Sequence, residues 1–334
     1  MTAVNRNETV LKWGLLSTAR INRRLIPAIR AADRAELSAV ASRSQPRAEA
    51  YAAEWGIPRA HGSYQALLDD PDVDAIYISL PNSLHAEWAV RAAEAGKHVL
   101  CEKPLAVSVA ECDRIIAAAQ SAGVVVIEAL MYLHHPLLHK ARQLVLEGAV
   151  GQVILVRGAL SISLDRPNDV RWKPELGGGS LWDVGSYPVS FIRWMVGDPQ
   201  QVFGWQTLSK SGVDETFAGL LRHSSGVLGV FDCGFRELFR SQAEVFGTEG
   251  TLIIEQPHVI APESRILLRR DSEEREISLP QADPYRCEVD ALTAAVIDRV
   301  PLPVPLASSR ANVATMVALY ESARLGLAQL VSHT

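Results

Sequence analysis

The chain has 334 residues, which at ~150 residues per domain predicts about two domains, with cores large enough to need no metal or disulfide staple. Hydrophobic residues make up 48% and charged residues 21% of the chain, and this balance excludes an intrinsically disordered protein. The formal net charge of −5 gives no electrostatic reason to bind nucleic acid or an anionic membrane, so a small polar molecule is the expected partner.

Apolar runs alternate with helical periodicity in the first part of the chain. The expected strands are residues 11–17, 37–42, 75–80, 98–101 and 124–127. Between them, apolar residues recur near the 3.6-residue period of a helix. Strands that alternate with helices predict βαβ units and a parallel sheet covered on both faces. We therefore expect an α/β protein whose residues 1–128 form a doubly wound, dinucleotide-binding Rossmann domain.

The pattern changes after about residue 150, where Gly and Ser turns separate successive strand-like runs. The expected strands are residues 152–163, 201–209, 216–221, 226–234, 242–246 and 251–255. This succession predicts a meander and hence a large, mostly antiparallel sheet. Helices are expected at 181–195, 284–299 and 308–327. Residues 129–334 should form an α+β domain for substrate binding and oligomerisation, with its last helix packed back on the first domain.

The helices expected in the second half are too few to cover both faces of its sheet. An open face predicts self-association, as a homodimer or a homotetramer through this sheet.

Four cysteines, Cys101, Cys112, Cys233 and Cys287, are scattered without a CxxC pair. They are expected to be separate thiols in a reducing compartment, not a disulfide framework. No stretch reaches the ~18 consecutive apolar residues of a membrane span, and residues 1–10 are polar, unlike a signal peptide. The sequence therefore predicts a cytoplasmic protein without a membrane partner.

The first expected strand leads into the turn where a dinucleotide-binding fold carries its GxGxxG fingerprint. Ser17, Ala19 and Asn22 occupy the three glycine positions, so the turn is small but lacks glycine. The motif by itself also fits an ordinary strand-to-helix turn. On the cofactor interpretation, the turn residues that contact the dinucleotide are Ser17, Thr18, Ala19, Arg20 and Ile21.

The second expected strand ends in Ser42 and Arg43. A fold specific for NAD would place an acidic residue here, on the ribose 2′-hydroxyl. A guanidinium and a serine hydroxyl suit a 2′-phosphate by charge and by geometry, so we predict a preference for NADP(H) over NAD(H). The alternative is an arginine that is merely solvated at a strand end.

The third and fourth expected strands end in polar residues. Carboxyl ends of parallel strands build the ligand crevice of open α/β sheets. The residues expected there, on the nicotinamide half of the cofactor, are Leu80, Pro81, Asn82, His85, Glu102 and Lys103. For His85 the alternative is a structural histidine, and an exposed lysine before a proline is common.

Two later segments, residues 128–136 and 177–188, complete a set of motifs. With residues 13–14, 41–43, 81–85 and 102–104, they make nearly the whole chain resemble the glucose-fructose oxidoreductase and inositol dehydrogenase family, Gfo/Idh/MocA. The resemblance implies hydride transfer between a nicotinamide and the carbinol or carbonyl carbon of a sugar, polyol or cyclic diol. The competing class is a non-catalytic NADP(H)-binding regulator on a dehydrogenase fold.

The resemblance also implies that Lys103, Asp183 and Tyr187 are the active-site lysine, aspartate and proton donor. Such a reaction needs a base for the hydroxyl proton and a group that stabilises the developing oxyanion. We expect Lys103 to polarise the oxygen and to lower the pKa of Tyr187, which exchanges the proton, while Asp183 binds substrate hydroxyls. Alternatively, Ser180 and Asp183 form a capping box, and Pro188 kinks the helix beyond Tyr187.

Tyr132, Arg171 and Trp172 are further candidates for substrate contact. Tyr132 is expected to line the crevice or to pack beneath it. Arg171 and Trp172 precede the triple glycine at 177–179, so we expect them to cover the substrate from a mobile loop. A loop that holds one buried tryptophan is the alternative.

His134, His135 and His139 lie close together in the sequence. Since no carboxylate or cysteine stands at ligand spacing nearby, and hydride transfer needs no metal, we expect no metal site.

Overall fold

The computed structural model describes residues 9–332, so the polar segment 1–10 lies almost wholly outside the described residues. The first sheet has six strands: β1 (Leu11–Leu16), β2 (Ala35–Ala41), β3 (Arg59–His61), β4 (Ala75–Ile78), β5 (His98–Cys101) and β6 (Val126–Glu128). Their order is β3-β2-β1-β4-β5-β6, and every neighbouring pair is parallel. This is the doubly wound sheet that the sequence predicts, and its crevice opens where the order reverses, between β1 and β4.

The helices of this half are α1 (Asn22–Ala31), α2 (Gln45–Trp55), α3 (Tyr64–Leu68), α4 (His85–Glu94) and α5 (Val109–Ala122). The short elements β3 and α3 are absent from the sequence-based expectation, because three and five residues are too few to show a period. Strand β4 is buried at all four positions, as expected for a strand with helices on both faces of its sheet.

The second sheet has nine strands: β7 (Val153–Ser163), β8 (Pro199–Leu208), β9 (Asp214–His223), β10 (Leu228–Gly234), β11 (Arg236–Gly247), β12 (Thr251–Glu255), β13 (Ile266–Arg270), β14 (Glu273–Ile277) and β15 (Gln329–Leu330). It is mostly antiparallel, as expected, but it is not a simple meander. Strand β7 lies between β10 and β11 and runs parallel to β10. Helices follow β7 in the chain, and the sheet resumes with β8. Strands β8, β9 and β10 then pair in succession, and the last of them, β10, pairs with β7.

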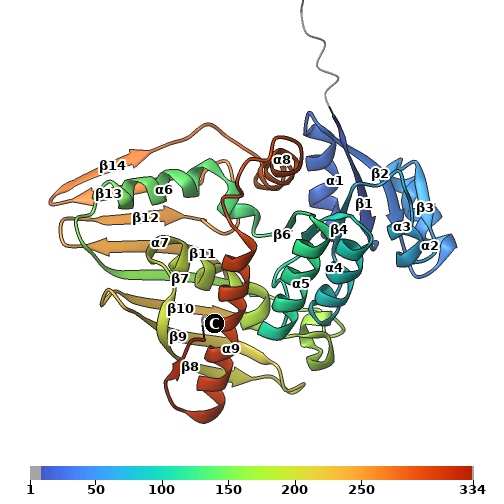
Figure 1. Cartoon of the computed structure of the whole chain (residues 1–334). Coiled ribbons are helices and arrows are strands. Elements are labelled where there is room, and N and C mark those ends of the chain that lie inside the picture. Colours follow the sequence, from blue (N-terminus) through green and yellow to red (C-terminus); the bar gives the residue numbers. More distant parts are fainter. Residues whose placement is uncertain (1–8, 333–334) are drawn as a thin grey trace, which may run out of the picture.

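Helices cover one face of the second sheet (Figure 1). They include α7 (Ser186–Val196), which packs on β7 and β10, and α9 (Leu306–Leu325), which packs on β8. Helix α9 also contacts α5 and β6 of the first half, so it lies between the two sheets. The remaining helices are α6 (Pro136–Leu146) and α8 (Pro284–Ile297), and α8 packs against α1.

Within residues 9–332, no helix combines the length and the apolar character needed to cross a membrane. All four cysteines are free thiols, as expected; Cys101, Cys112 and Cys233 are buried, and Cys287 is partly exposed.

Candidate active site

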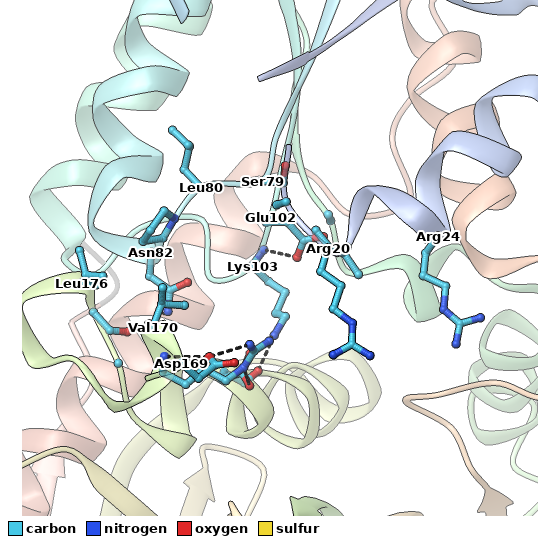
Figure 2. Close-up of a pocket in the computed structure, with 18 of the residues that line it drawn as sticks. Arg20, Arg24, Ser79, Leu80, Asn82, Glu102, Lys103, Asp169, Val170 and Leu176 are labelled. Carbon is cyan, nitrogen blue, oxygen red and sulfur yellow. Dashed lines mark hydrogen bonds and ion pairs between the residues drawn. The ribbon is translucent and has the colours of Figure 1, made fainter. Parts of the chain in front are cut away.

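A cleft of about 840 Å³ opens at the carboxyl ends of β4 and β5, between the two halves of the chain (Figure 2). Most of the expected site residues line it: Ala19, Arg20, Ile21, Leu80, Pro81, Asn82, Glu102, Lys103, Arg171, Asp183 and Tyr187. The first eight follow β1, β4 and β5, whose carboxyl ends meet at one edge of the sheet. The last three come from the second half of the chain and close the cleft from the other side.

The turn after β1 is held by side-chain hydrogen bonds that glycines at these positions could not make. Ser17 has φ 145°, a backbone conformation that favours glycine. Its hydroxyl lies 2.8 Å from that of Ser79 and accepts a bond from the Ala19 N–H. Asn22 joins both segments, because its amide donates to the Ser17 carbonyl and accepts from the Ser79 hydroxyl, each at 2.8 Å. Ser79 is the member of this group that the sequence did not single out.

The ammonium of Lys103 is held by Asp183. Its Nζ donates to Oδ1 of Asp183 at 2.7 Å and to the backbone oxygen of the same residue at 2.8 Å. Arg171 binds the other carboxylate oxygen through Nε at 2.5 Å. Burial by itself would raise the pKa of Asp183, but the charges of Arg171 and Lys103 hold it well below its usual range. Asp183 therefore stays ionised and fixes the direction of Lys103.

The capping-box alternative is not what the structure has. Ser180 makes no side-chain cap, and its hydroxyl instead donates to Asp214 at 2.6 Å. Asp183 lies in a π-helical segment, Leu181–Gly185, that runs directly into α7. Pro188 is the third residue of α7, which continues to Val196. The structure therefore has a widened, π-helical turn before Tyr187 in place of the expected kink beyond it.

Tyr187 meets Lys103 in the cleft, as the resemblance implied. The Lys103 ammonium lies 5.0 Å from the centre of the Tyr187 ring. The expected lowering of the Tyr187 pKa is wrong, however. Burial, together with Tyr285, Glu102 and Asp183, raises the pKa of this phenol well above its ordinary value of 10.0. Tyr187 is therefore a protonated phenol at neutral pH, suited to donating a proton.

Three expected contacts need correction. His85 is fully buried and its ring nitrogens contact the carbonyls of Pro104 at 2.7 Å and Leu80 at 2.8 Å, so it is a structural histidine. Tyr132 is also fully buried and does not line the cleft. Its hydroxyl donates to the Tyr187 carbonyl, so of the two expected positions Tyr132 has the one beneath the cleft. Trp172 packs edge-on against Phe235 and does not line the cleft, whereas its neighbour Arg171 does.

The triple glycine is tightly packed and not a loose hinge. A Cβ on Gly177 would come within 2.9 Å of Asn82, and a Cβ on Gly178 within 2.5 Å of the Arg171 carbonyl. The Asn82 amide donates to the Gly177 carbonyl at 2.8 Å. These glycines let the segment that carries Arg171 lie directly on the end of β4.

The three neighbouring histidines have separate environments. His135 accepts the Leu137 N–H at the start of α6, and His139 meets Trp194 edge-on. His134 is buried, and burial lowers its pKa to about 4.

Basic side chains also lie next to the first turn, outside the lining of the cleft. Arg47 of α2 donates through Nε to the Thr18 hydroxyl at 2.9 Å, and so joins α2 to the first turn. Burial raises the pKa of the Tyr64 phenol, and the charges of Arg43 and Arg47 both oppose that rise. Ser42 directly follows β2, and its backbone N–H donates to the His61 carbonyl at 3.0 Å.

Sequence reasoning missed several residues of the cleft, and three of them come from different elements. Arg24 lies in the first turn of α1, Met131 follows β6, and Tyr285 comes from α8. Met131 accepts the Tyr187 hydroxyl through sulfur at 3.7 Å. The position of Arg24 just beyond the first turn was the only sequence signal, because nothing local to residues 131 or 285 indicates a cleft.

Comparison with known proteins gives matches over most of the chain. The family model described as "Oxidoreductase family, NAD-binding Rossmann fold" matches residues 11–130, and the Gfo/Idh/MocA C-terminal domain matches residues 138–253. A D-xylose 1-dehydrogenase (NADP(+)) from Haloferax volcanii is 38% identical over 95% of this chain and 99% of its own. A trans-1,2-dihydrobenzene-1,2-diol dehydrogenase from Mus musculus is 32% identical over 74% of this chain and 75% of its own.

Solved structures agree with this assignment. A 3-ketoreductase from Actinomadura kijaniata, in complex with NADP and TDP-benzene, superposes with a TM-score of 0.88 at 28% identity and covers 94% of this chain and 98% of its own. An aldose-aldose oxidoreductase from Caulobacter crescentus, complexed with glycerol, has a TM-score of 0.89 at 26% identity, over 96% of this chain and 99% of its own. The chain therefore belongs to the Gfo/Idh/MocA family and is an NAD(P)-dependent oxidoreductase that acts on sugar-like substrates.

Proposed function

We propose that the protein transfers a hydride between NADP(H) and the carbinol or carbonyl carbon of a sugar, a polyol or a cyclic diol. The observation that carries this proposal is the approach of Lys103 and Tyr187, distant in the sequence, within 5.0 Å of each other in one cleft. The named activities of the xylose and dihydrodiol dehydrogenases, 38% and 32% identical, support the same substrate range.

Each site residue has a distinct task in this proposal. The bound nicotinamide supplies or accepts the hydride. An ammonium has three N–H groups, and two of those on Lys103 bind Asp183, which leaves one to donate to the reacting oxygen. Tyr187 exchanges the proton of that oxygen, since its phenol is protonated and lines the cleft. Asp183 orients Lys103, and its carboxylate borders the space for the substrate hydroxyls.

The test is a panel of aldoses, polyols and cyclic diols, with matching ketones or lactones for the reverse direction, followed at the NADPH absorbance. Turnover of at least one pair at rates typical of dehydrogenases supports the proposal. Tight NADPH binding without turnover of any compound in the panel would instead support the competing class, a non-catalytic NADP(H)-binding regulator.

We also propose that Arg43 and Arg47 give a preference for NADPH over NADH. Removing a charged partner of a phosphate costs roughly 1.5–3 kcal/mol. Arg43→Ala with Arg47→Ala should therefore raise the KM for NADPH by at least about tenfold. The KM for NADH, which lacks the 2′-phosphate, should change little and serves as the internal control. A wild-type enzyme that prefers NADH would contradict the assignment.

We further propose that the open face of the second sheet binds a second copy of the chain. Cross-strand register places Phe203, Trp205, Leu220 and Leu228 on the face turned away from α9. Trp205 is 63% exposed, Leu220 51% and Leu228 48%, and an apolar stripe of this kind marks an interface.

Trp205→Asp is expected to shift the protein from dimer or tetramer to monomer, because a charge would have to be buried at the centre of the interface. Light scattering after size exclusion measures this. Leu146→Asp is the matched control, because Leu146 is 72% exposed at the end of α6, away from the stripe. A wild-type monomer, or an unchanged oligomer in the Trp205 variant, would contradict the proposed interface.

Two broader assignments accompany these proposals. We place cofactor binding in residues 1–128 and substrate binding with oligomerisation in residues 129–334. Four free thiols, three of them buried, are compatible with the reducing cytoplasm in which we propose the enzyme works.

A further inference from the structure

The segment that carries Asp183 is held from outside the cleft by one buried carboxylate. Asp214, the first residue of β9, is 2% exposed and does not line the cleft. Its Oδ2 accepts the Ser180 hydroxyl at 2.6 Å and the Leu181 N–H at 2.7 Å, and its Oδ1 accepts the Tyr320 hydroxyl of α9 at 2.7 Å. These bonds join β9, the start of the π-helical segment and α9 at a carboxylate that the proposed reaction does not use.

Asp214 caps the π-helical segment Leu181–Gly185 from another strand. The N–H groups that begin a helix have no partner inside it, and Ser180 makes no side-chain cap. Asp214, 33 residues beyond Leu181, supplies the acceptor, and its carboxylate suits the partial positive charge of a helix N-terminus. Asp183 follows in the same turn, and both its carboxylate and its backbone oxygen hold the Lys103 ammonium. The cap therefore sets the place from which Asp183 directs Lys103.

Gly179 allows Asp214 to come this close. Its φ is 124°, and a Cβ there would clash with Oδ1 of Asp214 and lie 2.8 Å from the Tyr320 hydroxyl. The Gly179 carbonyl accepts the Asp183 N–H at 3.2 Å, and the Gly179 N–H donates to the Arg171 carbonyl at 3.0 Å. Because Asp183 and Arg171 form an ion pair, Gly179 connects the Asp214 carboxylate to the backbone of both partners.

We propose that Asp214 is a positioning residue, which holds the π-helical segment so that Asp183 directs the Lys103 ammonium at the reacting oxygen. This role rests on the proposed function, because that function is what gives Lys103 its task. Tyr320 ties the same carboxylate to α9, which also contacts α5 and β6 of the first half of the chain. Asp214 thus links the placement of Asp183 to the docking of the two halves, on which the meeting of Asp183 with Lys103 depends.

The kinetic test removes the cap. Asp214→Ala leaves the Leu181 N–H without its acceptor, so kcat should fall by about tenfold or more, while the KM for NADPH should change by less than about twofold. Asp214→Asn keeps an oxygen that can accept this N–H and should recover most of the lost kcat. Equal losses of kcat in the two variants, or no loss in Asp214→Ala, would overturn the proposal.

Asp70→Ala is the matched control for the loss of a buried carboxylate. Asp70 is 8% exposed, accepts the Asp72 N–H at 2.9 Å and does not line the cleft. The control should lower Tm and leave kcat unchanged, because none of its bonds reaches the π-helical segment. A kcat that falls as far in Asp70→Ala as in Asp214→Ala would assign the loss to stability and overturn the proposal.

Coupling to Lys103 separates positioning from a general loss of stability. In the Lys103→Ala background, Asp214→Ala should lower the residual kcat by no more than about twofold, because no ammonium is left to direct. A loss as large as in the wild type would show that Asp214 acts through another group and would overturn the proposal. Tyr320→Phe, which removes one donor and keeps the carboxylate, allows the same comparison should Asp214→Ala not fold.

Hydrogen exchange separates failure of this inference from failure of the proposed reaction, since it needs no turnover. In the NADP⁺-saturated protein, Asp214→Ala should speed exchange of the backbone N–H groups of residues 181–187 by about tenfold or more, and Asp70→Ala should not. Such a change supports the capping by Asp214 even if no sugar is oxidised. Oxidation of a sugar by the wild type, with exchange and kcat both unchanged in Asp214→Ala, would overturn the positioning role and leave the proposed reaction standing.

Discussion

Replacement of Lys103 by alanine is expected to lower kcat by about 100-fold to 1,000-fold, with a much smaller effect on NADPH affinity. The variant loses the N–H group that faces the cleft and the positive charge beside the oxygen on which negative charge develops. Both interactions strengthen as the transition state forms, so their loss falls on kcat and not on substrate binding. Steady-state kinetics in both directions, with NADPH affinity from fluorescence titration, measure the split.

The fold should survive this change, because Asp183 keeps Arg171 as a charged partner at 2.5 Å. Circular dichroism and thermal unfolding check this point. Lys140→Ala is the matched control, since Lys140 bonds only to Gln143 on the exposed side of α6 among the described residues. Added methylamine should restore part of the activity of the alanine variant by filling the space of the lost ammonium. Turnover within a few-fold of wild type, before any rescue, would exclude the proposed role of Lys103.

Most of the residues that the sequence places after the first, third and fourth strands line the cleft. Strands such as β1 and β4 are buried over most of their length, so their apolar sequences identify them as strands. The parallel order of the sheet then brings Leu80 and Lys103, which follow β4 and β5, to one edge. Asp183 and Tyr187 were found through the family resemblance and not through spacing. Their meeting with Lys103 depends on how the second half docks, which no local pattern encodes.

The errors have physical causes of the same kind. The charged residues of β14, from Glu273 onward, lie exposed at the edge of the sheet and give no apolar alternation to detect. Tyr285 reaches the cleft because α8 packs on α1, a contact between segments far apart in the chain. The pKa of Tyr187 was misjudged because its burial outweighs the nearby ammonium, and burial is a property of the folded state alone.

Tyr187→Phe is expected to lower kcat by about 100-fold to 10,000-fold, the contribution typical of a positioned proton donor. The ring should stay in place, because it packs against Tyr132 and His258. The hydroxyl donates only to Met131 sulfur among the described residues, at 3.7 Å, so its removal should cost about 1 kcal/mol of stability or less. Kinetics and NADPH titration test this, with Tyr132→Phe as control, because that buried hydroxyl lies behind the cleft and its loss should change turnover only a few-fold.

The pH dependence of kcat tests whether the Tyr187 hydroxyl exchanges the proton of the substrate oxygen. Since burial raises the pKa of Tyr187, the phenol stays protonated from about pH 6 to about pH 9. Reduction of a carbonyl uses that proton, so its kcat should be flat over this range. Oxidation of an alcohol needs the deprotonated phenol, whose fraction grows about tenfold per pH unit below its pKa, so kcat for oxidation should rise with pH. Tyr187→Phe should abolish this slope. A variant that retains it would show that another group exchanges the proton.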